Sequence, residues 1–226
     1  MAVVRFLGDV HHQFDAITPF LEDCDFSLQV GDLGFDYRFL AGFDVNRHKF
    51  IGGNHDNYDQ YYGVAHVVTS KDGLKDFGAS SIGGLDFYFV RGAFSIDWKR
   101  RQEAFFKGYK SWWDNEELSL EDMFAAFEDY KVVAPDFMVS HDCPSSVSKL
   151  VGDKSLLKHF GYDAISFSTR TGELLQSMFE AHKPKVWVFG HYHEAFDEVI
   201  DGVRFICVPE LGYRDVLVND GGFEIV

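Results

Sequence analysis

The sequence contains a set of side chains that could together bind metal ions. The set combines carboxylates, one amide and four imidazoles: Asp9, His11, Asp32, Asn54, His141, His191 and His193. Mixed oxygen and nitrogen ligands suit borderline divalent ions such as Mn, Fe or Zn, whereas Ca and Mg prefer oxygen alone. The absence of a thiolate argues against a structural zinc site. The set is larger than one catalytic zinc needs, but two ions that share a carboxylate would use all of it.

Each candidate ligand follows a short apolar run. The runs occupy residues 2–7, 26–30, 50–51, 137–139 and 186–189, and similar runs occur at 87–90 and 203–208. Short runs rich in Val, Ile and Phe and bounded by glycine predict buried strands. Because α/β folds place their sites at strand ends, we expect the polar groups to converge. In Asp9-Val10-His11 and His191-Tyr192-His193, continued strand geometry would point both ligands to one side.

Helical patterns lie between these runs. Apolar spacing predicts helices near 14–21 and over 171–182. The clearest helix is predicted over 116–130, with Leu120, Met123, Phe124, Phe127 and Tyr130 on one face. No repeat or Pro/Ser-rich linker interrupts the chain, so we expect one α/β domain over 1–226. Residues 144–182 form either a small lid or a crossover insertion.

Composition limits the class of partner. The 226 residues include 21 basic and 36 acidic side chains, a formal net charge of −15. This charge argues against stable binding to duplex DNA through a broad basic face. A nucleotide or RNA substrate remains open, because bound divalent cations would reverse the local charge.

Cysteine usage and apolar segment lengths bear on the compartment. The three cysteines lack CxxC spacing and are expected to be free thiols in a reducing compartment. The apolar stretch at residues 2–7 is too short for a signal peptide, and no apolar run reaches 18 residues. We expect a cytoplasmic protein without a membrane partner, and the oligomeric state is left open.

Five motifs occur in an order that resembles the calcineurin-like metallophosphoesterase superfamily. They are DVH (9–11), GDLG (31–34), GNHD (53–56), SHDCP (140–144) and GHYH (190–193). The resemblance implies a four-layer αββα sandwich in which two mixed β-sheets are flanked by helices, with a binuclear site at the strand ends. It also implies which side chains hold each ion, with Asp32 bridging: Asp9, His11, Asp32 and His193 for the first, and Asn54, His141 and His191 for the second.

The resemblance further implies catalytic roles. His55 would contact the scissile phosphate and protonate or stabilise the leaving oxygen, while Asp56 would orient His55 or cap the next turn. Two cations would lower the pKa of a bridging water, and the resulting hydroxide would attack phosphorus without a covalent enzyme nucleophile. We therefore predict a phosphodiesterase that binds two divalent ions, with Mn expected and Fe, Ni or Zn open.

Four departures from the family pattern bear on the substrate. The GDLG motif lacks the arginine of Ser/Thr protein phosphatases, and Asp56 replaces their glutamate, so a phosphomonoesterase is the alternative rather than the first choice. Gly34 and Phe35 stand where family nucleases often have histidine. His12 replaces the usual glycine, and either reaches substrate or lies on the surface. The non-enzyme alternative is a catalytically inactive binding scaffold, as in a retromer subunit of this fold.

The segment 91–113 is the most basic part of this acidic chain. We hypothesise that Arg100 or Arg101 binds a phosphate and that Trp112 or Trp113 stacks on a base or ring. The alternative is that the arginines are solvated and the tryptophans belong to the core.

Overall fold

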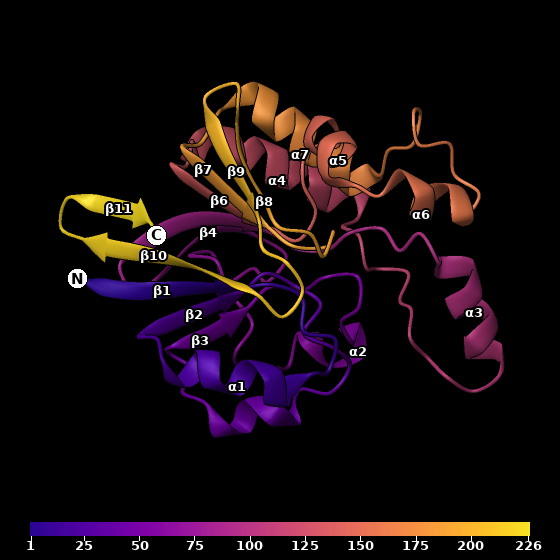
Figure 1. Ribbon diagram of the computed structural model, residues 1–226, viewed down its shortest axis with the longest axis horizontal. Coiled ribbons are helices and arrows are strands. Elements are labelled where there is room, and N and C mark those ends of the chain that lie inside the picture. Colours follow the sequence, from indigo (N-terminus) through magenta and orange to yellow (C-terminus); the bar gives the residue numbers. More distant parts are fainter.

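The computed structural model describes residues 1–226 and shows two β-sheets packed face to face (Figure 1). The first sheet has the order β11-β10-β1-β2-β3. Its parallel centre comprises β1 (Ala2–Leu7), β2 (Phe26–Gln29) and β3 (His48–Phe50). The antiparallel hairpin of β10 (Tyr213–Asn219) and β11 (Gly222–Ile225) extends it beyond β1.

The second sheet has the order β4-β5-β6-β7-β9-β8. Four of its strands are parallel: β5 (Leu85–Val90), β6 (Phe137–Ser140), β7 (Val186–Phe189) and β9 (Val203–Cys207). The edge strands β4 (Phe77–Ile82) and β8 (Phe196–Ile200) are antiparallel to their neighbours. Both sheets are therefore mixed, as expected.

Apolar side chains fill the space between the sheets. Phe6 of β1 stacks on Phe137 of β6 with ring centroids 5.3 Å apart, and both are fully buried. On the outer faces, α1 (Phe14–Glu22) packs on the first sheet through Ile17 and Leu21. The helices α4 (Leu120–Val133) and α7 (Arg170–Ala181) cover the second sheet (Figure 1). The predicted αββα sandwich is confirmed.

The remaining helices lie in the connections. They are η1 (Arg38–Gly42), α2 (Tyr58–Tyr61), α3 (Trp98–Phe106), α5 (Ser145–Val151) and α6 (Lys154–His159). Figure 1 shows α3 and α6 at the same end of the molecule, beyond the strands. None of the helices has both the length and the apolar character that a membrane-crossing segment needs.

The helix predicted over 116–130 begins later than expected. Ser119 caps α4 by accepting a hydrogen bond from the backbone N of Asp122 at 3.1 Å, so the first helical residue is Leu120. Leu120 and Phe124 are 71% and 68% exposed, and the buried face consists of Met123, Ala126 and Tyr130. The single apolar face predicted from spacing was therefore wrong, because the packing against β4 and β5 selects a narrower stripe.

Candidate metal centre and active site

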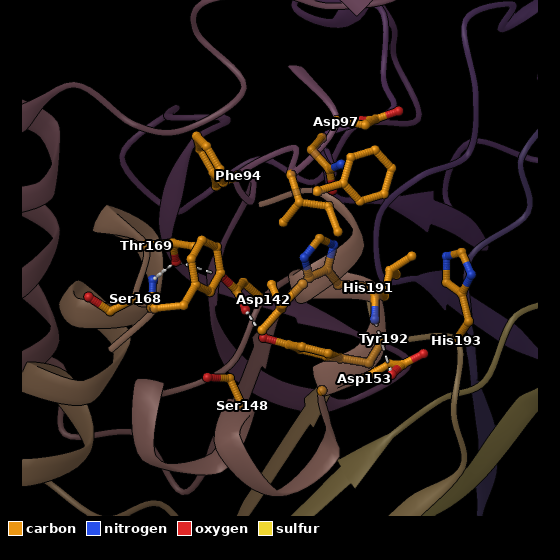
Figure 2. A pocket seen from close by; sticks show the side chains of 18 of the residues that line it. Phe94, Asp97, Asp142, Ser148, Asp153, Ser168, Thr169, His191, Tyr192 and His193 are labelled. Carbon is orange, nitrogen blue, oxygen red and sulfur yellow. Dashed lines mark hydrogen bonds between the residues drawn. The ribbon is translucent and has the colours of Figure 1, made fainter. Parts of the chain in front are cut away.

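A cavity of about 270 Å³ lies where the parallel strands end. At one end it is lined by the predicted site residues Asp32, Asn54, His55, His191 and His193. Figure 2 shows His191 and His193 at this end, with Phe94 farther along the cavity. Site residues that are distant in sequence thus line the same cavity.

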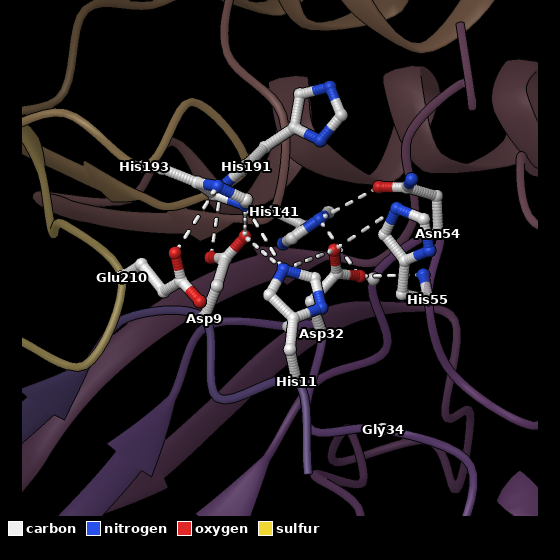
Figure 3. A network of polar contacts seen from close by, with 12 residues as sticks. Asp9, His11, Asp32, Gly34, Asn54, His55, His141, His191, His193 and Glu210 are labelled. Atoms are coloured by element: carbon white, nitrogen blue, oxygen red, sulfur yellow. Dashed lines mark hydrogen bonds and ion pairs between the residues drawn. The ribbon is translucent and has the colours of Figure 1, made fainter. Parts of the chain in front are cut away.

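All predicted ligands converge in this region (Figure 3). Asp9 and His11 follow β1, Asp32 follows β2, and Asn54 follows β3. His141 follows β6, and His191 and His193 follow β7. The ligands therefore come from both sheets, at the end of the sandwich where the parallel strands finish.

The ligand atoms form two groups, each with all its atoms within 4.8 Å of one another. The groups are Asp9, His11 and His193, and Asp32, His141 and His191. In the first, His193 Nε2 lies 3.0 Å from both Asp9 Oδ2 and His11 Nε2. In the second, His141 Nε2 lies 3.2 Å from Asp32 Oδ1 and 3.1 Å from Asn54 Oδ1.

Asp32 lies between the groups. Its Oδ1 faces His141 at 3.2 Å, and its Oδ2 lies 3.8 Å from His11 Nε2. A carboxylate that presents one oxygen to each group has the position expected of a shared ligand.

Two buried oxygens test whether cations fit here. The Oδ2 atom of Asp32 is buried and accepts no hydrogen bond, and the buried Oδ2 of Asp9 faces the His193 ring nitrogen at 3.0 Å. A buried charged oxygen without a partner is costly, and a divalent cation would compensate it. Carboxylate, amide oxygen and imidazole nitrogen are also suitable donors for Mn, Fe or Zn. The residues present therefore fit a pair of divalent cations.

The backbone brings these side chains together through strained turns. His11, Asp32, His191 and His193 have φ values of 46°, 60°, 69° and 60°, in the left-handed region. Strands β1 and β7 end at Leu7 and Phe189, so the predicted continuation of strand geometry through 9–11 and 191–193 was wrong. Such conformations cost about 1–2 kcal/mol each and concentrate at functional sites.

Glycines allow the close approach of neighbouring segments. A Cβ on Gly53 would lie 2.2 Å from Asp32 Oδ1, and a Cβ on Gly31 would lie 2.2 Å from His141 Nδ1. Only glycine fits at such distances, which explains on steric grounds why glycine precedes both Asn54 and Asp32.

The carboxylates favour positive charge at the second group. Although burial opposes protonation, the Asp32 carboxylate raises the pKa of His141 to about 10. A site that stabilises an extra proton so strongly is electrostatically suited to a cation in its place.

A family model described as calcineurin-like phosphoesterase matches residues 2–195. The chain belongs to that family. No curated protein sequence matches it. A proposed 5′-nucleotidase from Staphylococcus aureus, solved with α-ketoglutarate, is similar over 99% of this chain and 52% of its own, with 12% identity and a TM-score of 0.56. This chain thus spans about half of that protein, with which it shares the fold.

Two further solved structures match along their full lengths. A hypothetical protein from Thermus thermophilus has 13% identity and a TM-score of 0.48, covering 99% of this chain and 98% of its own. A protein from Thermotoga maritima has 16% identity and a TM-score of 0.44, with coverages of 100% and 98%.

His55 points into the cavity beside the ligand groups. Its Nε2 lies 4.0 Å from Asp32 Oδ2, and its ring centroid is 5.2 Å from that of His11. Arg101 Nη2 lies 3.3 Å from the same Nε2. Burial lowers the pKa of His55 to about 4, and Arg101 adds to that effect. A neutral imidazole still carries one N–H with which to donate a hydrogen bond.

Asp56 does not contact the His55 ring. Its Oδ2 accepts hydrogen bonds from the backbone N atoms of Asp32 and Gly53 at 2.9 and 2.7 Å. Its Oδ1 accepts from the N of Gly34 and the hydroxyl of Tyr37, both at 3.2 Å. Asp56 therefore ties the second and third motifs together, and the predicted orienting contact with His55 is absent.

The structure separates the predicted substrate-binding residues. Arg101 lines the cavity, whereas Arg100 is exposed on α3 and does not. His12 also lies outside the cavity, and its Nε2 accepts a hydrogen bond from the N of Phe35 at 3.1 Å. Trp113 is buried against Phe35, with ring centroids 5.3 Å apart. Neither Trp112 nor Trp113 lines the cavity.

Several supporting residues were not found from the sequence. Ser95 and Glu116 hold the Asn54 amide, and Asp142 accepts a hydrogen bond from the Tyr192 hydroxyl at 2.6 Å. Glu210 Oε2 lies 3.6 Å from His193 Nδ1, where a carboxylate can orient a ligating imidazole (Figure 3). Asp142 lies within the SHDCP motif and Ser95 within the segment 91–113, but no sequence signal distinguishes Glu116 or Glu210.

Proposed function

We propose that the protein is a binuclear metal-dependent phosphoesterase that hydrolyses small or nucleotidic phosphodiesters. The observation that carries this proposal is the pair of ligand groups around Asp32, with His55 Nε2 4.0 Å from the shared carboxylate. Bound divalent cations, with Mn expected, would polarise the phosphate and lower the pKa of a water between them. The completeness of the ligand set favours an enzyme over a binding scaffold.

The protein's own side chains would orient the ester and assist its leaving group. His55 would donate a hydrogen bond to the departing oxygen, since its ring faces the cavity next to both ligand groups. Arg101 would bind a non-bridging phosphate oxygen, because its guanidinium lies 3.3 Å from His55 Nε2. Asp56 would hold the backbone of Asp32 and Gly53 in register.

The charges around the cavity support a diester over a monoester. One arginine, Arg101, lines the cavity together with three carboxylates outside the ligand set: Asp97, Asp142 and Asp153. A monoester carries up to two negative charges at neutral pH and a diester one, so the diester meets less repulsion.

A metal-loading and turnover experiment tests the proposal. Protein purified with Mn²⁺ should retain close to two equivalents and hydrolyse bis-p-nitrophenyl phosphate faster than p-nitrophenyl phosphate. His55→Ala should keep its metal and lose about 100-fold or more in kcat, the range of general acid catalysis. Two bound equivalents without turnover on either ester would favour a scaffold, and undiminished activity in the variant would remove His55 from the mechanism.

A further inference from the structure

The cavity continues well beyond the space that a phosphate group needs. Its far part is walled by apolar side chains from two separate segments: Phe94, Ile96, Leu156, Leu157, Phe160 and Phe167. Phe94 and Ile96 follow β5, whereas the others belong to α6 and the chain that follows it. The metal ligands make no use of this part.

Three of the six apolar wall residues are phenylalanines, and two of these pack on each other and on Tyr162 behind the wall. The ring centroids of Phe94 and Phe167 are 6.2 Å apart, and both rings pack against Tyr162, at 6.2 and 4.7 Å. Phe94, Phe160 and Phe167 are only partly buried, so each keeps ring surface available in the free protein. Aromatic faces bind planar groups by stacking, at about 1–3 kcal/mol per nucleobase.

Polar groups border the apolar wall. Four polar residues also line the cavity: Ser148, Asp153, Ser168 and Thr169. Figure 2 shows Ser168 and Thr169 on the side of Phe94, and Ser148 farther from Phe94, beyond Tyr192. Ser148 and Thr169 already donate to Ser145 and Asp142, and Asp153 accepts from the backbone N atoms of Ser155 and Leu156. Their remaining lone pairs and the Ser168 hydroxyl could still pair with the hydroxyls and amino groups of a nucleoside, which an acyl chain lacks. A cavity of about 270 Å³ is near the lower end of small-ligand sites, which suits one nucleoside rather than a longer oligonucleotide.

From this arrangement we propose that Phe94, Phe160 and Phe167 form a nucleobase subsite. It would hold the base of a nucleotide ester whose phosphate lies between the ligand groups and Arg101. The inference rests on the proposed function, because it places the phosphate at the metal centre. It assigns to the 144–182 segment the role of completing the substrate site, through α6 and residues 160–167.

Equilibrium binding tests the subsite separately from catalysis. The probes are adenosine 5′-monophosphate, methyl phosphate and hexyl phosphate, titrated calorimetrically into Mn²⁺-loaded protein. The nucleotide should bind about tenfold or more tightly than either alkyl phosphate. Phe160→Ala and Phe94→Ala should each weaken nucleotide binding about fivefold or more and change methyl phosphate binding less than about twofold. Phe124→Ala is the matched control, because Phe124 is exposed on α4, outside the cavity.

The outcomes distinguish the two proposals. If neither methyl phosphate nor the nucleotide binds and bis-p-nitrophenyl phosphate is not hydrolysed, the phosphate site and hence the proposed function fail. If that diester is hydrolysed although neither monoester binds, the proposed function stands and the nucleobase subsite is overturned. If both bind with equal affinity, or if hexyl phosphate matches the nucleotide, the phosphate site stands and the nucleobase subsite is overturned. Equal weakening of all three probes by both Phe160→Ala and Phe94→Ala, at an unchanged melting temperature, would also overturn it.

Discussion

Asn54 donates from its side-chain Nδ2 to Ser95 Oγ at 3.0 Å, and Ser95 Oγ donates to Glu116 Oε2 at 2.7 Å. Burial raises the pKa of Glu116 to about 8. Above that pH the ionised carboxylate takes the Ser95 proton, so the Ser95 oxygen can only accept from Asn54. The carbonyl Oδ1 of Asn54 is thereby directed at the second ligand group, 3.1 Å from His141 Nε2. A buried carboxylate on another segment thus fixes which atom of an amide faces the metal site.

Glu116→Gln should reverse this chain of hydrogen bonds. Glu116 Oε1 accepts from the N of Ser95 at 2.8 Å, so the glutamine oxygen would take that place and its NH₂ would donate to Ser95 Oγ. Ser95 would then donate to Asn54 and turn its amide, which should weaken Mn²⁺ binding at the second group by about 10–100-fold. Metal titration measures this directly. Glu117→Gln is the control, because Glu117 contacts Thr171 instead; unchanged Mn²⁺ affinity in Glu116→Gln would contradict the prediction.

Asp32→Asn should reduce bound metal from two equivalents to one or none. The amide would keep one oxygen and present NH₂ to the other ligand group, and the shared negative charge would be lost. Elemental analysis after gel filtration measures the stoichiometry. Asp36→Asn is a suitable control, because Asp36 pairs with Arg38 on the surface. Two retained equivalents in Asp32→Asn would show that the carboxylate is not shared.

Asp56→Asn should destabilise the fold. All four groups around its carboxylate donate hydrogen bonds, so an amide NH₂ would face a donor in a fully buried site. The expected loss is about 1–3 kcal/mol in the free energy of unfolding, measured by urea denaturation of metal-free protein. A variant with unchanged stability and reduced kcat would instead support the role of orienting His55.

Arg101→Ala should raise the KM for a phosphodiester several-fold while the metal content stays constant. The guanidinium lies in the cavity, held by Asp97 at 2.7 Å and next to His55. Arg100→Ala serves as the matched control, since the side chain of Arg100 is next in sequence but is exposed and lies outside the cavity. Equal effects of the two substitutions would mean that general attraction of the anion, and not a specific contact, explains the change.

His48 should make metal-free protein less stable as the pH falls. Burial lowers the pKa of His48, which lies at the start of β3 with its Nδ1 3.0 Å from Ser27 Oγ. Below about pH 6.5 the unfolded chain binds a proton that the folded protein resists, so the free energy of unfolding decreases with decreasing pH. His48→Gln should lose less stability than wild type between pH 7 and 5, measured by denaturation with chelator present. His159→Gln, on the exposed surface of α6, should follow the wild type, and identical slopes for all three proteins would refute the assignment.

The strand-forming runs and the polar groups that follow them could be predicted from the sequence. The run 186–189 is continuous and apolar because its strand is buried on both faces, which leaves a strong local signal. The run 2–7 is interrupted by Arg5, which is buried beside Asp215, but its other residues are apolar. The edge strand β8 was missed, because three of its five side chains are exposed and the two acidic ones interrupt the apolar run. The extent of α4 was also misjudged, since the residues that face the second sheet depend on the docking of the helix.

The identity of the candidate ligands was readable from residue types and motif order, whereas their supporting contacts required the tertiary structure. Ser95 comes within hydrogen-bond distance of both Asn54 and Glu116 only because three connections meet at one end of the sandwich. Likewise, only the fold separates Arg101 from Arg100 and directs Asp56 away from His55. The chemistry of a single side chain can be read from the local sequence, but the orientation of that side chain depends on residues far away along the chain. For this protein, composition and order determined what the site is made of, and the packing of two sheets decided where each atom points.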